Sequence, residues 1–296
     1  MATMLSTANA TPVCDRQCLL EILTIYTDAI SQKNTSAIPV APNVRITNNG
    51  NVTTLGGGLV WQTPGELRFP YRHAFVDPVT GAATFRSTIT NITVTEFTAE
   101  AIANPPAGVW WYFGLRLKVV NGLICEIEEI ASATGFPGAQ PQLLTFSDRI
   151  WDAPIPVEQR ATRDELAATA DKYWDTVSGS DWRKAPFHPE CQRIEMGTTT
   201  VNAIFAPGSC GTEFLGSFLQ GGIVTNRRVY AIDPVYGTVV GVGWFGSQNT
   251  SNPNGSVVYE EFKIQDGLLR HIEAVFDFAG QQWSGWGTGR GSSPPS

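Results

Sequence analysis

The chain has 296 residues, of which 42% are hydrophobic, 10% aromatic and 16% charged, enough for one large domain or two ordinary ones. Its formal net charge of -7 argues against nucleic acid as a partner, because a phosphate-binding surface needs clustered lysine and arginine. No apolar run reaches the roughly 18 residues that a membrane helix requires. We therefore expect a folded chain with neither a nucleic-acid nor a membrane partner.

The N-terminal stretch MATMLSTANATPVC lacks the hydrophobic segment of a complete signal peptide. Ala8-Asn9-Ala10 nevertheless has the small-x-small form that precedes a signal cleavage site. Two interpretations stay open: a truncated signal whose mature product begins near Thr11, or an ordinary flexible start. Residues 1–10 are therefore predicted to be a residual signal or tag segment.

The first half of the chain reads as one helix followed by strands. Residues 18–34 carry apolar side chains at helical spacing and lead into the proline-broken stretch IPVAPNVRITNNG. The next run, RHAFVDPVTGAATF, places Pro after Asp and Gly three residues beyond the Pro, which predicts a tight turn between two strands. A long hairpin, VWWYFGLRLKVVNGLICEIEEI, is predicted to turn at Asn121-Gly122.

The second half repeats this order. Residues 164–181 are a predicted helix in which Tyr173 and Asp175 match Tyr26 and Asp28 at an offset of 147. The stretch APFHPECQRIEMG follows, and RRVYAIDPVYGTVVG repeats the turn phrase 156 residues after its first occurrence. The last hairpin, VVYEEFKIQDGLLRHIEAVF, is predicted to turn at Asp-Gly. The chain is therefore an internal repeat.

Each unit is predicted to be α+β, a helix packed in the concavity of a curved antiparallel sheet, the shape of a cone. Two such cone domains in one chain would form an intrachain pseudo-dimer. The boundaries we predict are 11–135 for the first domain, 136–160 for a proline-rich linker, 161–289 for the second domain and 290–296 for a disordered tail.

Cysteines and glycosylation triplets favour a secreted or secretory-pathway protein. Cys191 and Cys210 flank a short segment that a disulfide could close. Either Cys14 or Cys18 could join Cys125 and staple the first helix to the sheet, leaving an odd thiol. N-x-Ser/Thr triplets begin at Asn34, Asn51, Asn91, Asn249 and Asn254.

Several of these stretches resemble one protein family. RATRDELAATADKYWDTVSG, FHPECQRIEMGTTT and VTNRRVYAIDPVYGTVVG are similar to the fungal secreted SnoaL-like proteins of the NTF2-like (cystatin-like α+β) superfamily. In the first half the helix that begins C-D-R-x-C-L-L, APNVRITNNG and the DPVTG turn resemble the same family. The resemblance covers nearly the whole chain outside the linker and tail, and it implies two NTF2-like domains.

The resemblance also implies a range of activities. The superfamily includes polyketide cyclases, dehydratases, isomerases and non-catalytic binding modules. Its tandem secreted fungal members include hetero-Diels–Alderases of tropolonic sesquiterpene biosynthesis, which bring a quinone methide together with an olefin such as humulenol. The His/Asp/Tyr set of the dehydratases and the Asp–His arrangement of the cyclases have no clear counterpart here.

Two candidate catalytic residues lie on the last hairpin. His271 aligns with Glu126 of the first half, and a histidine on a strand can be a general acid or base or a structurally bonded residue. Glu261 aligns with Arg116, so the halves carry opposite charges at matching positions. This divergence predicts that at most one half performs the chemistry, although a salt-bridged or solvated face would explain it equally well.

The repeated turn region supplies the other two catalytic candidates. Arg72 and Arg228 precede the shared strand in both halves, so they are better explained as structural, each pairing with an acid of its own unit. Arg227 and His73 are less symmetric and are therefore the better candidates. Local packing and substrate binding both remain open for the copy-specific aromatic residues. The predicted substrate-binding residues are Trp61, Trp110, Tyr112, Arg116, Trp174, Trp182, Trp244 and Tyr259.

We therefore predict a cofactor-free cyclase or pericyclase acting on a small hydrophobic or aromatic natural product. The specific reaction that the resemblance implies is a hetero-Diels–Alder addition of a polyketide-derived quinone methide to a terpene olefin. The alternatives are a SnoaL-like dehydratase or isomerase and a secreted binding protein without turnover. We expect no cofactor or metal, because the three histidines are scattered and no C-x-x-C occurs. A homodimer remains open.

Overall fold

The structure is a computed structural model of the chain. It describes residues 14–90, 110–132, 148–179, 181–201, 210–211, 222–247 and 255–277. The predicted signal segment, the predicted tail and the triplets at Asn91, Asn249 and Asn254 lie outside these residues, as do the side chains of Trp110 and Trp182.

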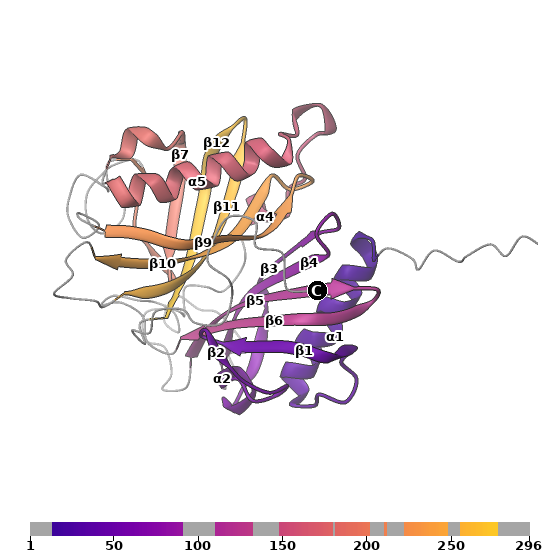
Figure 1. Cartoon of the computed structure of the whole chain (residues 1–296). Helices are drawn as coiled ribbons and strands as arrows, with labels where there is room; N and C mark the ends of the chain where they lie inside the picture. The colour runs from indigo at the N-terminus through magenta and orange to yellow at the C-terminus, as the bar shows by residue number, and fades with distance from the viewer. Residues whose placement is uncertain are drawn as a thin grey trace, which may run out of the picture.

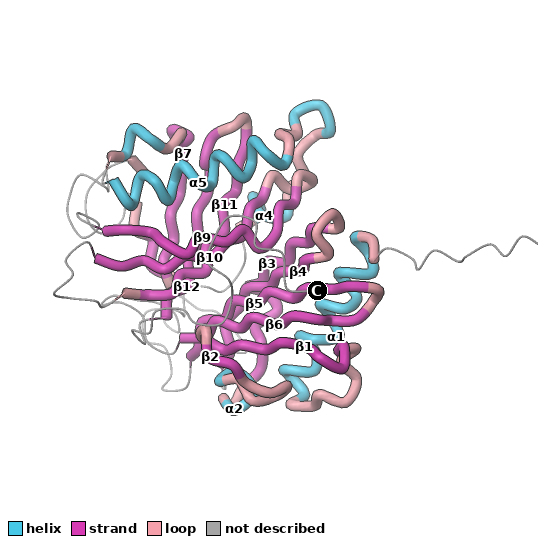
Figure 2. Tube along the Cα trace, viewed as in Figure 1, coloured by secondary structure: helices cyan, strands magenta, loops and turns pink. Residues whose placement is uncertain are grey.

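The described part of the first half contains a long helix and six strands (Figures 1 and 2). The sheet has the strand order β2-β1-β6-β5-β4-β3. Its elements are α1 (Arg16–Gln32), β1 (Val40–Asn48), β2 (Asn51–Val52), α2 (Leu59–Gln62), β3 (Glu66–Asp77), β4 (Ala82–Thr90), β5 (Trp110–Val120) and β6 (Leu123–Ser132).

The described part of the second half repeats this plan with the strand order β8-β7-β12-β11-β10-β9. Two short elements, α4 (Arg149–Asp152) and η2 (Val157–Gln159), precede it in the predicted linker. Its elements are α5 (Arg163–Gly179), η3 (Trp182–Lys184), β7 (Phe187–Glu195), β8 (Thr198–Thr199), β9 (Gly222–Asp233), β10 (Thr238–Ser247), β11 (Ser256–Gln265) and β12 (Leu268–Asp277).

The predicted α+β pseudo-dimer is confirmed, with one refinement of the sheets. The strand after each helix pairs in parallel with the last strand of its unit, β1 with β6 and β7 with β12, whereas the other pairs are antiparallel. The parallel pair arises because the chain crosses from β1 to the far edge at β3 and returns through successive antiparallel strands.

Both predicted hairpin turns are present. Asn121 and Gly122 have φ values of 51° and 76°, and Asp266 and Gly267 have values of 52° and 73°. Two consecutive positive φ angles characterise the type I′ turn, whose twist matches that of the flanking strands. The Asn-Gly and Asp-Gly pairs therefore predicted both hairpin turns correctly.

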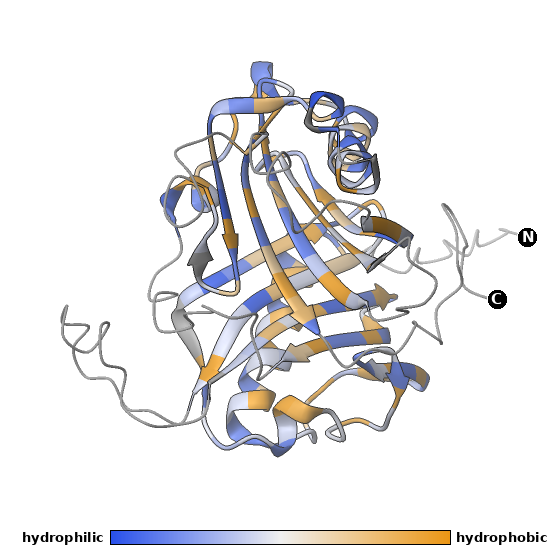
Figure 3. Cartoon of the chain, turned by 90° about the vertical axis from the view of Figure 1, so that its left-hand side faces the viewer, coloured by the Kyte–Doolittle hydropathy of each residue, from blue (hydrophilic) through white to orange (hydrophobic). Residues whose placement is uncertain are grey.

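Three hydrophobic clusters divide the molecule into layers. One joins α1 to the first sheet, one joins α5 to the second, and a third fills the space between the two sheets. The order is helix, sheet, sheet, helix, as the hydropathy view also shows (Figure 3). Tyr259 lies in the middle cluster with its ring against Gly114, where an added Cβ would come within 2.7 Å of the ring.

The aspartates of the repeated Asp-Pro turn form ion pairs between the two halves. Asp77 accepts hydrogen bonds from Arg163 of the other half at 2.8 and 2.6 Å. Asp233 accepts from Arg16 at 3.0 and 2.6 Å. Arg16 and Arg163 begin their helices 147 residues apart, so each half contributes the same contact to the other. This reciprocity makes the interface isologous, as in a twofold dimer.

The disulfides differ in part from the prediction. Cys191–Cys210 forms as expected, but Cys14 bonds to Cys18 and not to the sheet. The two Cα atoms are only 5.3 Å apart at the start of α1, a separation typical of a disulfide. Cys125 is left as the free thiol among the described cysteines. Within the described residues, no helix is both long and apolar enough to cross a membrane.

Candidate functional site

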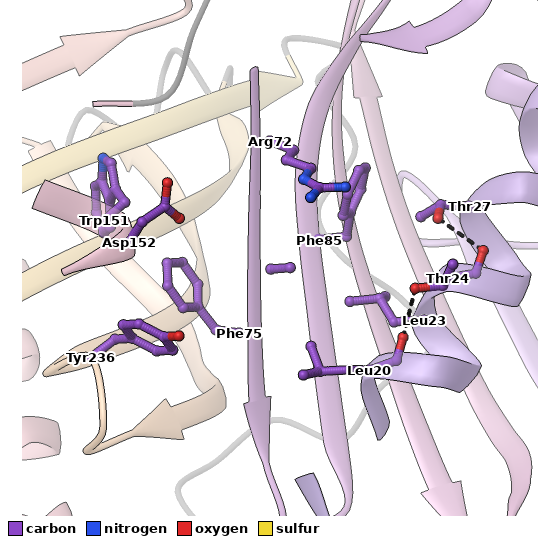
Figure 4. A pocket seen from close by; sticks show the side chains of 11 residues that line it. Leu20, Leu23, Thr24, Thr27, Arg72, Phe75, Phe85, Trp151, Asp152 and Tyr236 are labelled. Atoms are coloured by element: carbon purple, nitrogen blue, oxygen red, sulfur yellow. Dashed lines mark hydrogen bonds between the residues drawn. The ribbon is translucent and has the colours of Figure 1, made fainter. Parts of the chain in front are cut away.

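A pocket of about 210 Å³ lies where α1, the edge strand β3 and the second half meet. Figure 4 shows its side chains on both sides of β3, with the α1 residues on one side and those of α4 and the β9–β10 turn on the other. The lining residues are Leu20, Leu23, Thr24, Thr27, Arg72, Ala74, Phe75, Phe85, Trp151, Asp152 and Tyr236.

Aromatic rings form much of the pocket wall. The ring centre of Phe75 lies 5.8 Å from that of Trp151 and 6.2 Å from that of Tyr236, and Phe85 lines the opposite side of β3 (Figure 4). Trp151 is held in place because its Nε1 donates to Glu273 at 2.9 Å. Such a wall suits a flat, mostly apolar ligand.

Polar side chains also line the pocket, namely Thr24, Thr27, Arg72, Asp152 and the hydroxyl of Tyr236. Arg72 and Asp152 are both exposed, which places a cation and a carboxylate where the pocket reaches the surface. The hydroxyls of Thr24 and Thr27 donate to carbonyls of their own helix, at 2.9 and 3.0 Å (Figure 4). The guanidinium of Arg72 is therefore the strongest donor group among the lining side chains.

The second half has a tryptophan where the first half has pocket space. The helices α1 and α5 each have 17 residues and align at an offset of 147, which pairs Thr27 with Trp174. The indole of Trp174 packs against Gly241, where an added Cβ would lie 2.6 Å from the ring, and its Nε1 donates to Glu260 at 2.7 Å. Gly241 occupies the position of Phe85. The second half therefore carries its large side chain on the helix, at Trp174, whereas the first half carries it on the sheet, at Phe85.

A register shift in β9 alters the alignment of the arginines. Ala74 pairs with Phe85 in the first half, and Val229 pairs with Gly241 in the second. Ala74 therefore corresponds to Val229. The residue two positions earlier is Arg72 in the first half and Arg227 in the second, so these two arginines correspond in space. The bulge between Val240 and Gly241 causes this one-residue difference.

Arg227 forms ion pairs with α5, the helix of its own unit, and its predicted catalytic role stays a prediction. Its Nη1 donates to Asp171 at 3.0 Å and to Asp175 at 2.6 Å. The residue of α1 aligned with Asp171 is Thr24. The helix α5 therefore carries a carboxylate at the position where α1 carries a hydroxyl.

Three of the four predicted catalytic residues meet in a buried cluster between the sheets. His73 Nδ1 lies 2.5 Å from Glu261 Oε2, and His271 Nε2 lies 3.3 Å from Glu273 Oε1. Arg86 lies between the two carboxylates, 3.6 Å from Glu261 and 3.3 Å from Glu273. Burial raises the pKa of Glu273, but Arg86 and the histidines outweigh it and hold that pKa well below its usual range.

This cluster lies behind the aromatic wall of the pocket. The ring of His73 lies 4.7 Å from that of Trp151, and Tyr71 donates to Glu273 at 2.8 Å. Among the described residues, His73 Nε2, Arg86 Nε and His271 Nδ1 are buried without a hydrogen-bond partner. Such atoms normally bond to ordered water, so the site has unused hydrogen-bonding capacity.

A second cluster occupies the corresponding place in the pseudo-dimer. Arg116 donates to Glu128 and Glu126 at 2.7 Å each, and Arg228 of the other half donates to Glu128 at 2.8 and 2.6 Å. Tyr230 adds a bond to Glu128 at 2.7 Å. Arg228 therefore pairs across the interface, which corrects the prediction of an acid in its own unit. Burial raises the pKa of Glu128, but both arginines outweigh it and lower the pKa.

The remaining predicted residues are dispersed. Trp61 and Tyr26 each donate to Glu129 at 2.8 Å inside the first cone, and burial raises the pKa of that carboxyl to about 7. Trp244 is buried between the sheets. Tyr112 donates to the Met196 carbonyl at 2.7 Å.

Sequence reasoning missed the pocket residues Arg72, Phe75, Phe85, Trp151 and Tyr236. The Thr27–Trp174 contrast was readable at the offset of 147, but Trp151 lies in a non-periodic segment. Within the described residues, no group of three or more histidine, cysteine or acidic side chains is arranged to hold a metal ion.

Residues 159–276 match a family model described as a domain of unknown function (DUF8021). A search of curated proteins gave no match. Among solved structures, the chain is similar to AclR, a putative hydroxylase from Streptomyces galilaeus, with 14% identity over 40% of this chain and 81% of that one and a TM-score of 0.31.

A putative ketosteroid isomerase from Kribbella flavida has 17% identity over 42% of this chain and 85% of that one, with a TM-score of 0.29. An NTF-2 like protein of unknown function from Burkholderia xenovorans has 8% identity over 41% and 91%, with a TM-score of 0.29.

Proposed function

We propose that the protein is a cofactor-free cyclase and that its substrate binds in the pocket of the first half. The finer proposal is a hetero-Diels–Alder reaction between a polyketide-derived quinone methide and a terpene olefin. The observation that carries the proposal is the pocket itself, which has Phe75, Trp151 and Tyr236 on one side of β3 and Phe85 with the Arg72 donor on the other, and a tryptophan at its counterpart position.

The size of the pocket limits how the reactants bind. Its 210 Å³ is below the roughly 300–1,000 Å³ of sites that enclose a drug-sized ligand. The pocket therefore accepts one flat ring system, and the second reactant approaches from the open side. Holding one reactant still and limiting the approach of the other lowers the entropic part of the barrier and fixes the face of attack.

Arg72 supplies the electrostatic part of the proposed catalysis. In the cycloaddition the oxygen of the quinone methide gains electron density as the olefin attacks the exocyclic carbon. A guanidinium donor beside that oxygen stabilises the charge as it develops, which is the role of an oxyanion hole. The loss of such a donor typically costs about 2–4 kcal/mol of transition-state stabilisation.

The test is product analysis with purified chain, a quinone methide and a humulenol-type olefin. We expect a single stereoisomer above the uncatalysed background, and Arg72→Ala to lower the rate about 100-fold, in line with the loss of one donor. Arg227→Ala is the matched control, because it removes the corresponding arginine from the half in which Trp174 takes the place of Thr27. Equal rates for the two variants would remove Arg72 from the mechanism.

The buried pair of His73 and Glu261 favours a second candidate, a SnoaL-like isomerase or dehydratase. A histidine beside a carboxylate can transfer protons if the wall at Trp151 admits the substrate. Conversion of a single substrate without an olefin, abolished by His73→Gln, would favour this candidate. Tight binding with unchanged reaction rates would indicate a binding protein.

We also propose that the protein is secreted and glycosylated. Two disulfides and the exposed side chains of Asn34 and Asn51, each heading an N-x-Ser/Thr triplet, support this. Mass spectrometry of chain made in a secreting eukaryotic host, before and after glycosidase treatment, tests it.

A further inference from the structure

Lys263 on β11 is a buried amine next to the pocket. Its side chain is 1% exposed, and its Nζ donates to the carbonyl of Ala153 at 2.9 Å. The same Nζ lies 6.0 Å from the ring centre of Tyr236. Tyr236 and Asp152, the residue before Ala153, both line the pocket. Lys263 therefore lies behind the wall that these two residues form.

The corresponding lysine of the first half is at the surface. Lys118, 145 residues earlier, is partly exposed and donates to the carbonyl of Thr80 in the turn of its own unit. The linker causes this difference in exposure. The carbonyl of Ala153 accepts the hydrogen bond of Lys263, and the backbone N–H of Ile155 donates to the carbonyl of Val235 at 2.8 Å. The linker has thus enclosed an amine that is accessible in the other half.

The surroundings of Lys263 make its neutral form more accessible than that of an exposed lysine. Burial lowers the pKa to about 8, against the opposing charges of Asp233 and Asp152. Asp233 forms an ion pair with Arg16 at 2.6 Å, which weakens the electrostatic attraction between Asp233 and Lys263. His271 faces Lys263 on β12. A desolvated lysine with a lowered pKa is the form in which this side chain acts as a nucleophile.

We propose that Lys263 captures an aromatic aldehyde bound in the pocket as a reversible imine, reached past the ring of Tyr236. The Nζ lone pair forms a bond to the carbonyl carbon, and the oxygen leaves as water with the two amine protons. Tyr236 is half-buried on a turn, with Arg16 5.2 Å from its ring centre, and the proposal requires this ring to rotate away from Nζ. The proposal concerns the pocket and does not depend on the cycloaddition.

The experiment traps the imine on the full chain. Protein is incubated with 2-naphthaldehyde and sodium cyanoborohydride, which delivers hydride to the imine carbon, and the adduct is located by peptide mass spectrometry. We expect modification of Lys263 at least about 10-fold above that of Lys118, even though Lys118 is more exposed. Tyr236→Ala should accelerate the labelling, because it opens the route from the pocket.

Two controls decide the outcome. Lys263→Met should abolish the dominant adduct, whereas Lys118→Met should not. On the wild-type chain, 2-methylnaphthalene, which has the ring but no carbonyl, should suppress labelling of Lys263 and leave Lys118 unchanged. Labelling of Lys118 equal to that of Lys263, or no suppression by the competitor, would overturn the proposal, whatever the result of the cycloaddition assay.

Discussion

The two halves share one plan but use the space beside the long helix differently. In the first half, Thr27 and Phe85 leave a pocket, and in the second Trp174 and Gly241 fill the corresponding volume. The charges differ as well, since Arg227 forms an ion pair with Asp171 of α5, whereas the aligned position of α1 is the uncharged Thr24. The comparison teaches that two copies of one plan can differ at the contact between helix and sheet, where one has a pocket and the other a packed tryptophan.

The largest expected effect is the removal of the tryptophan that fills the second half. Trp174→Thr should destabilise the chain by about 3–5 kcal/mol, because it leaves a cavity and removes the indole donor to Glu260. Urea denaturation would measure the change. Thr27→Ser, at the aligned position, should cost under about 1 kcal/mol. Similar losses of unfolding free energy in both variants would show that the two halves are packed alike at these positions.

The converse change should move the large side chain of the pocket from the sheet to the helix. The double variant Thr27→Trp with Phe85→Gly reproduces the residues of the second half in the first. We expect ligand binding to weaken about 100-fold, equivalent to about 3 kcal/mol. Calorimetric titration with 2-methylnaphthalene would measure it. Unchanged affinity would place the ligand elsewhere in the molecule.

Each half also carries a buried carboxyl beside an indole N–H, Glu129 beside Trp61 and Glu260 beside Trp174. Burial raises both pKa values to about 7, above the ordinary 4.5, so the folded state binds protons that the unfolded state has released. Stability is therefore expected to fall between pH 5 and pH 8, by about 2 kcal/mol per group.

Glu129→Gln and Glu260→Gln should each remove one part of this pH dependence. The urea midpoint of each variant would then differ less between pH 5 and pH 8 than the midpoint of the wild type does. A variant whose pH dependence equals that of the wild type would indicate that its carboxyl is ionised in the folded state.

The smallest and most symmetric effect should come from the paired turns. Asp77→Asn and Asp233→Asn each weaken one bidentate arginine contact between the halves. We expect a loss of about 1–2 kcal/mol in each case, because the arginines are partly exposed and retain one acceptor. Thermal denaturation of the two variants should give nearly equal shifts, and clearly unequal shifts would contradict the reciprocity.

Local signals predicted the fold well. The helix at Tyr26 and Tyr173, and the hairpins at Asn121-Gly122 and Asp266-Gly267, follow from periodicity and from residues that accept positive φ. The parallel pairing of β1 with β6 was missed, because it depends on a crossover that no local pattern records.

The candidate site was harder to predict. His73, Glu261 and His271 were identified, but their meeting depends on contacts between halves that are 188 residues apart in the case of His73 and Glu261. Arg72 was assigned a structural role because simple alignment matched it to Arg228. The bulge in β9 shifts that match by one residue, and a bulge cannot be read from a repeat.

Tyr259 and Gly114 hold matching positions, 145 residues apart, and they touch each other. Two separate, identical subunits would present two rings or two bare backbones at this point, and would either collide or leave a void. A chain that carries two different copies can place one ring against one glycine. Fusion of the copies therefore did more than raise their local concentration: it permitted an asymmetric centre from which the pocket and its filled counterpart could evolve apart.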